Sequence, residues 1–351
     1  MRFRRFLSAL FVLSLAACSG GGGSPGAPPA EGGASRASRF ADCEALRAYL
    51  AQAAATQSTL WERYGAVLET VSGSGPVPAG TPASDAAEGA ADAGGAAAPE
   101  REYSNTNVQE EGVDEPDFVK TDGERLYVVT GGTFLVFDVW PPEGTEEVAR
   151  VDLEGHPVAL LVHGSTVLVL SQVWESAAAE TVDRPWWGPR LRAAVFDVTD
   201  PAAPRVVREV EFEGAYVDAR LVEGRAHLVI QTWIPAVGGG VPAPPGLLDA
   251  GGAGAEAQPG LDSWDGEDLL PQYRDTWFGP DGEVTAERAV CPCENVFQPP
   301  VPNGTGFVTI ATLDLEDPEA DLAAVSLLTN SGVVYGSQAS LYLATPNDGY
   351  W

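Results

Sequence analysis

Histidine, cysteine, acidic and aromatic side chains are the residues of this chain that could do chemistry. Nothing groups the three histidines: His163 and His227 lie at or near predicted hairpins and His156 near another turn, and no H-x-H or H-x-x-x-H pair offers a metal site. The sequence contains no P-loop, and no G-x-S-x-G elbow joins a predicted strand to a helix. A Ser-His-Asp triad would have to be assembled in space from distant segments. The sequence therefore predicts no catalytic residue and no cofactor, and it favours a protein that is not an enzyme.

Two acidic clusters hold enough carboxylates to be considered for Ca²⁺, which prefers oxygen ligands. Neither cluster has the alternating ligand order of an EF-hand loop. In a chain that is acidic throughout, solvated acidic loops are the simpler interpretation. The weak calcium candidates are Asp114 and Asp117 in the first cluster and Asp262 and Asp265 in the second.

The four cysteines allow covalent chemistry. Cys18 lies near the N-terminus and is treated below, which leaves an odd number of thiols for an oxidising compartment. Cys43 could pair with Cys291 or with Cys293, the latter two could bridge each other, or thiols could stay free. A bridge from Cys43 would link an N-terminal helical segment to the main domain. Three scattered thiols lack a fourth ligand, so a zinc site is not expected.

Tryptophans gather in or beside two predicted insertions. Indole rings stack on glycans and on a partner's side chains, which makes these residues candidates for ligand binding. The same rings could instead form small cores that keep long insertions ordered. The candidates are Trp174, Trp186, Trp187, Trp264 and Trp277, and Trp233 adjoins the second insertion.

The composition excludes several classes of protein. The chain has 351 residues, 44% of them hydrophobic, which is enough to build a core and argues against wholesale disorder. It carries 50 acidic and 20 basic residues, a formal net charge of −30, so nucleic acid is not an expected partner. The 40 glycines and 28 prolines are typical of a loop-rich extracytoplasmic β protein.

The N-terminus predicts export. Three arginines precede an apolar run at 6–15 that has the length of a secretory signal and is too short to span a membrane. The run ends in Leu-Ala-Ala-Cys18, which resembles the lipobox of bacterial lipoproteins. That resemblance implies cleavage before Cys18 and acylation of Cys18, including a palmitate-type chain. Ser19, in place of aspartate, implies delivery to the outer membrane of a Gram-negative bacterium. We therefore expect a cell-envelope protein whose only membrane contact is the lipid anchor; ordinary secretion is the alternative.

The rest of the chain divides by composition. Two stretches are rich in glycine, alanine, proline and serine, which favours flexible connections. Between them, apolar residues recur at helical spacing. After residue 103, short β-branched and aromatic runs predict strands, and several are apolar throughout, which indicates burial on both faces. The expected segments are a signal peptide at 1–17, a tether at 18–38, a helical segment at 39–71, a disordered linker at 72–102 and a β domain at 103–351.

A strand, a glycine turn and a second strand recur along the β domain, around Gly123, Gly164, Gly224 and Gly336. The first spacing is 41 residues, and removal of two insertions, 174–190 and 234–305, brings the other two to 43 and 40. A period near 40 with about four short strands is typical of a β-propeller blade. An apolar run that ends in aspartate is a second marker, at Asp138, Asp197 and Asp314. The prediction is a mainly β chain that forms a partial β-propeller of about three blades plus one strand. A β-sandwich is the alternative.

The segment at 103–123, YSNTNVQEEGVDEPDFVKTDG, closely resembles the opening motif of a family of secreted bacterial and archaeal β-propeller proteins distantly related to WD40 repeats. The similarity continues through 291–296, 307–315 and 334–345. This resemblance implies the propeller fold and secretion, and it implies no catalytic activity. Members of that family continue for several more blades, so the chain is expected to be truncated and not to close into a ring.

An open ring would leave particular strands without partners. We expect the segment Phe118–Lys120 to be an outer strand whose partners would come from the C-terminus. We also expect the blade face at Val128 and Phe137, and the last strand at 341–344, to be uncovered.

Together these features favour a surface-anchored lipoprotein with a β-propeller that serves as a binding or scaffold domain. Its expected ligand is an envelope protein or a glycan. Two alternatives stay open: a propeller hydrolase or lyase with a carboxylate-based site, and a structural component of envelope assembly.

Overall fold

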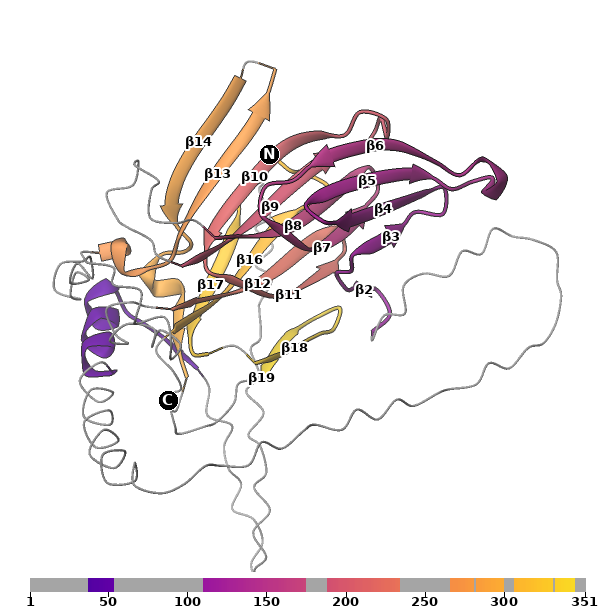
Figure 1. Cartoon of the computed structure of the whole chain (residues 1–351). Helices are drawn as coiled ribbons and strands as arrows, with labels where there is room; N and C mark the ends of the chain where they lie inside the picture. The colour runs from indigo at the N-terminus through magenta and orange to yellow at the C-terminus, as the bar shows by residue number, and fades with distance from the viewer. Residues whose placement is uncertain are drawn as a thin grey trace, which may run out of the picture.

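The structure is a computed structural model of the chain, and it is mainly β (Figure 1). No helix within the described part of the chain is long and apolar enough to cross a membrane. The residues that the structure describes are 37–53, 110–174, 188–233, 266–280, 282–299, 306–330 and 332–344.

Three units of four antiparallel strands form the centre of the fold, and each has the meander order of a propeller blade. Blade 1 consists of β3 (Val119–Thr121), β4 (Arg125–Thr130), β5 (Thr133–Asp138) and β6 (Glu146–Asp152). Blade 2 consists of β7 (His156–His163), β8 (Thr166–Trp174), β9 (Pro189–Asp197) and β10 (Arg205–Glu213). Blade 3 consists of β11 (Ala215–Val222), β12 (Arg225–Trp233), β16 (Gly306–Asp314) and β17 (Ala323–Leu328).

A fourth unit follows with two strands, β18 (Val333–Gly336) and β19 (Leu341–Ala344), which pair with each other. The partial propeller is therefore confirmed as three blades and a hairpin, one strand more than the single strand expected.

The blades lie face to face, which explains the strands that are apolar throughout. Along β8, Val167 and Val169 belong to the core between blades 1 and 2, whereas Leu168 and Leu170 belong to the core between blades 2 and 3. Successive side chains of a strand point to opposite faces, so a blade between two others needs apolar residues at every position. The prediction of burial on both faces is confirmed for this strand.

The insertion between β12 and β16 adds strands to two blades instead of forming a separate body. Its hairpin, β13 (Gln272–Gly279) and β14 (Gly282–Ala289), extends blade 2 to six strands, with β13 antiparallel to β10. A short strand, β15 (Val296–Gln298), pairs in parallel with β17, and β1 (Ser38–Arg39) pairs with β15. Three 3₁₀ turns complete the described elements: η1 (Pro142–Gly144), η3 (Gly266–Leu269) and η4 (Cys293–Asn295).

A helix at 43–53 packs on this extended blade 3 and represents the described part of the expected helical segment at 39–71. Asp42 caps its N-terminus, because its Oδ1 accepts a hydrogen bond of 2.8 Å from the Ala45 N–H. Leu46 and Leu50, four residues apart on one face, are fully buried in the core between blades 2 and 3.

Two expectations about the open ends are wrong. The segment at Phe118–Lys120 is not an outer strand, because β3 pairs with β4 as the first strand of blade 1. The last strand is not uncovered: Leu341 and Leu343 are buried against blade 3, since the hairpin lies on that blade's outer face. Val128 and Phe137 are partly exposed. Within the described residues, no strand pairing joins blade 1 to the β18–β19 hairpin, so these elements form no closed ring.

Candidate functional site

The acidic segment at 110–121, here called the signature segment, runs along the first strands of all four units. Its strand β2 (Val113–Asp114) pairs with β11 of blade 3. Asp117 exchanges two backbone hydrogen bonds with Leu160 of β7, at 2.8 and 3.2 Å. β3 then enters blade 1. The signature segment therefore positions its carboxylates along the inner edge of the blades.

Protein cations neutralise several of these carboxylates. Lys120 is buried, and its Nζ lies 2.7 Å from the Asp114 Oδ1. Arg220 of β11 is also buried; its guanidinium lies 3.7 Å from Glu115 and 2.6 Å from Asp218. A buried cation needs such partners because desolvation otherwise disfavours its charge. The carboxylates thus have a structural role in joining β2, β3 and β11.

The same segment holds the β18–β19 hairpin. The Tyr335 hydroxyl donates a 2.9 Å hydrogen bond to Glu110, and the Gln338 amide donates one of 2.7 Å to the Glu111 carbonyl. Gly112 adopts φ +79°, and a Cβ there would lie 2.7 Å from the Gln338 amide nitrogen. The glycine therefore permits both the left-handed turn and the close approach of the hairpin.

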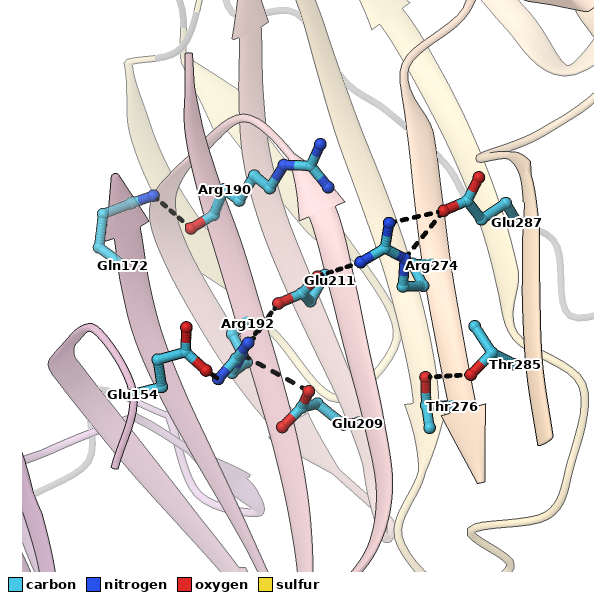
Figure 2. Close-up of polar contacts among 10 residues, drawn as sticks. All are labelled: Glu154, Gln172, Arg190, Arg192, Glu209, Glu211, Arg274, Thr276, Thr285 and Glu287. Carbon is cyan, nitrogen blue, oxygen red and sulfur yellow. Dashed lines mark hydrogen bonds and ion pairs between the residues drawn. The ribbon is translucent and has the colours of Figure 1, made fainter. Parts of the chain in front are cut away.

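A second polar feature crosses blade 2 where the β13–β14 hairpin extends it. Figure 2 shows its side chains on β9, β10, β13 and β14, and Glu154 in the turn before β7. We call it the polar ladder. Its members are Glu154, Arg192, Glu209, Glu211, Arg274, Thr276, Thr285 and Glu287.

Charges of opposite sign alternate along the polar ladder from one strand to the next. Arg192 is surrounded by three carboxylates, with contacts of 2.6 Å to Glu154, 2.5 Å to Glu211 and 3.6 Å to Glu209. Glu211 also lies 3.6 Å from Arg274, which in turn contacts Glu287 at 2.8 Å. Cross-strand pairs of opposite charge stabilise a sheet, so the polar ladder fixes the hairpin on blade 2.

The polar ladder contains more carboxylates than guanidinium groups, and this excess affects the pKa of Glu209. Burial raises the pKa of Glu209, and the neighbouring carboxylates Glu211 and Glu154 add to the rise while Arg192 opposes it. A cross-strand pair of hydroxyls, Thr276 and Thr285 at 3.0 Å, continues the polar surface to β14. The arrangement offers an acidic, partly open sheet face.

A buried cluster on the opposite face of the hairpin secures it to blade 3. Arg208 is 1% exposed, and its Nε and Nη2 donate to the two carboxylate oxygens of Asp275 at 2.9 and 2.6 Å. Its Nη1 donates to the carbonyls of Pro318 and Ala320 at 2.8 and 2.7 Å. The guanidinium lies 5.1 Å from the centre of the Trp277 ring. Trp277 therefore stacks on Arg208, which gives this ligand-binding candidate a structural contact.

The structure places the other candidate residues as follows. Trp174 and Trp233 end the second strands of blades 2 and 3, next to the two insertions, and they are 74% and 46% exposed. The described residues hold no group of three or more His, Cys, Asp or Glu side chains that could bind a metal, and the calcium candidates Asp114 and Asp117 form none. The candidates outside the described residues are Cys18, Trp186, Trp187, Trp264, Asp262 and Asp265.

Of the cysteine pairings that the sequence leaves open, the structure contains Cys43–Cys293, with Cα atoms 5.1 Å apart. This disulfide ties the helix at 43–53 to the insertion. Cys291 is a buried free thiol whose Sγ lies 3.6 Å from the Ser326 hydroxyl, and burial raises its pKa to about 11. Such a thiol is unreactive at neutral pH.

Sequence reasoning missed both the polar ladder and the Arg208 cluster. A local signal for the polar ladder exists, because Arg190 and Arg192 on one strand, and Glu209 and Glu211 on the next, are spaced two residues apart. That spacing puts like charges on one face of a strand. No comparable local signal marks Arg208 and Asp275, which lie 67 residues apart.

Comparison with known proteins supports the fold. The family model described as a beta propeller domain matches residues 103–351. A protein from Archaeoglobus fulgidus, described as uncharacterized, is 29% identical over 150 residues, which cover 39% of this chain and 20% of the relative. A second uncharacterized protein, from Methanocaldococcus jannaschii, is 28% identical over 133 residues, or 38% of this chain and 18% of the relative. The matches thus span about a fifth of each relative's length. No solved structure matches the chain.

Proposed function

Because the chain belongs to the beta-propeller domain family, whose fold suits binding and scaffolding, we propose that it is a non-enzymatic binding module of the cell envelope. In this proposal Cys18 carries the lipid anchor, and the propeller presents its insertion-bearing end to an envelope protein or glycan. The lipobox-like segment supports the anchor.

The observation that carries the proposal is the pair Trp174 and Trp233. They occupy equivalent positions in neighbouring blades, at the ends of β8 and β12, and both are exposed. A flat indole that is exposed can stack on a sugar ring or on a partner's side chain, and here two of them stand at the same end of neighbouring blades.

The signature-segment carboxylates do not favour the alternative of a carboxylate-based hydrolase. Asp114 and Glu115 contact Lys120 and Arg220, so their charges already have protein partners. Such ion pairs support a structural role, and no observation on this segment points to a reacting group.

The test is capture of envelope material by the purified mature chain. A W174A/W233A variant should lose most of the captured protein or glycan, identified by mass spectrometry and sugar analysis. Trp140 is a matched control, because it is 54% exposed and follows β5 at the opposite ends of the strands. If W140A loses as much material as W174A/W233A, or if W174A/W233A loses none, the proposed surface is wrong.

A further inference from the structure

We propose that the outer edge of β14 (Gly282–Ala289) binds an extended, cationic segment of a partner protein, which adds to the blade 2 sheet as a further strand. This inference rests on the proposed binding function and names a partner chemistry for it. Strand addition to an exposed sheet edge is a general mode of peptide recognition, in which the backbone supplies hydrogen bonds and the alternate side chains supply specificity.

The outer edges of the three blades differ in how they are protected from pairing with a further strand. In blade 3, β17 is covered by β15, which is itself covered by β1. In blade 1, β6 ends the sheet, but a bulge between Val136 and Phe137 interrupts its register with β5. Bulges of this kind discourage pairing at an edge. Blade 2 alone has its edge moved outward by an added hairpin, so that β14 is the last strand (Figure 1).

β14 has the properties of a strand that can accept a partner. All eight of its residues pair with β13 in one uninterrupted register, from Gly279↔Gly282 to Gln272↔Ala289. No described residue pairs with its outer side. The strand contains no proline, and Val284 on the face away from the polar ladder is 64% exposed. A regular, exposed edge of this length is normally avoided in a protein that has no use for it.

The polar ladder indicates which charge a partner strand added next to β14 should carry. On β14, the polar-ladder face carries Glu283, Thr285 and Glu287 at alternate positions. Glu287 contacts only Arg274 within the polar ladder, and its side chain is 47% exposed. Continuing the alternation of charge requires a cation opposite Glu287 and another opposite Glu283, with a hydroxyl opposite Thr285. The predicted partner strand therefore reads basic, apolar, hydroxyl, apolar, basic.

The charge of the whole chain favours the same partner. A net charge of −30 attracts cationic segments over a longer range and repels acidic ones. A second copy of the chain would bring its own Glu283 and Glu287 to the interface, so self-pairing along β14 is disfavoured.

The test uses the purified mature chain and a fluorescent nonapeptide that alternates lysine, valine, threonine and valine, with lysine at each end. Binding is measured by fluorescence anisotropy at about 0.15 M salt, where long-range attraction is screened. We expect the peptide to bind and amide hydrogen exchange to slow within 282–289. The double variant E283K/E287K should bind the peptide at least about tenfold more weakly, because two favourable charge pairs become repulsive.

The control is a double variant that changes the net charge by the same amount at a site far from β14. Glu143 and Glu146 are exposed at the start of β6 and the turn before it, so E143K/E146K should retain binding within about twofold. A peptide with glutamate in place of lysine should instead prefer the E283K/E287K variant. Equal weakening by both double variants, or unchanged exchange within 282–289 when peptide is bound, would overturn the proposal. Loss of this binding alone leaves the tryptophan-dependent capture intact, so the two proposals fail separately.

Discussion

Replacing Arg208 with methionine should destabilise the protein strongly, because this side chain joins three parts of the fold. It lies on β10 of blade 2, pairs with Asp275 on β13 and donates to the loop carbonyls of Pro318 and Ala320 in blade 3. Methionine has a similar length, so the variant removes the charge and the donors without leaving a large cavity.

The size of the effect follows from burial. Asp275 is 3% exposed, so the variant leaves a buried carboxylate without its cation. Removing one partner of a buried ion pair costs about 3–5 kcal/mol. That loss is a large fraction of the roughly 5–15 kcal/mol by which a domain is stable. The double variant R208M/D275L removes both charges and should recover most of the loss, because replacing a whole buried pair with apolar groups is often nearly neutral.

The assay is urea unfolding followed by tryptophan fluorescence. Arg205 provides the control: it lies three residues away at the start of the same strand and contacts Asp197 at 2.7 Å, but it is largely exposed. R205M should cost no more than about 1 kcal/mol. If R208M costs no more than R205M, or if R208M/D275L is as unstable as R208M, the ion pair does not anchor the hairpin and the reasoning is refuted.

Three further outcomes are expected. Cys18→Ser should leave the protein unacylated and move it from membrane to soluble fractions in cell fractionation; unchanged partitioning would contradict the anchor. Cys43→Ser should lower the free energy of unfolding by about 2–5 kcal/mol, because the disulfide closes a sequence separation of 250 residues, and reductant should then have no further effect in urea titrations. Burial lowers the pKa of His227, so the unfolded chain takes up the proton first as the pH falls. The contribution of this histidine to stability should therefore be complete above pH about 6.5, decline as the pH falls from there towards the lowered pKa, and level off below it. His227→Gln should flatten that decline in urea titrations at stepped pH.

Signals from residues close together in the sequence were sufficient to predict the blades. The recurring aspartates at strand ends have a physical cause that a sequence can reveal. The Asp197 and Asp314 carboxylates accept backbone hydrogen bonds of 2.9 Å from Thr199 and Glu316, two residues further on. This contact shapes the turn after the third strand of blades 2 and 3 and needs only neighbouring residues. A repeat built on such contacts is visible without knowledge of the fold.

Contacts between distant segments were not predictable in the same way. In the sequence the segment 234–305 interrupts the repeat of about 40 residues, but in the structure it supplies β13, β14 and β15 to two blades. The pairing of β13 with β10 depends on which edge is free once the blades have assembled, and that is a property of the whole fold. The disulfide between Cys43 and Cys293 likewise depends on where the helix packs.

The signature segment shows how a motif that appears chemical can be structural. The sequence made Asp114 and Asp117 weak calcium candidates, yet Asp114 contacts Lys120, and its neighbours Glu115 and Glu110 contact Arg220 and the tyrosine hydroxyl of the last hairpin. Within the described residues no strand pairing connects blade 1 to that hairpin, whereas the signature segment contacts blades 1, 2 and 3 and the hairpin in turn. Acidic side chains suit this task because the first strands of blade 1, blade 3 and the hairpin offer them the donors Lys120, Arg220 and Tyr335, whereas the contact with blade 2 is made by the backbone of Asp117. Since the inner edge is occupied by these internal contacts, binding is better sought on the outer surfaces, at the exposed tryptophans and along β14.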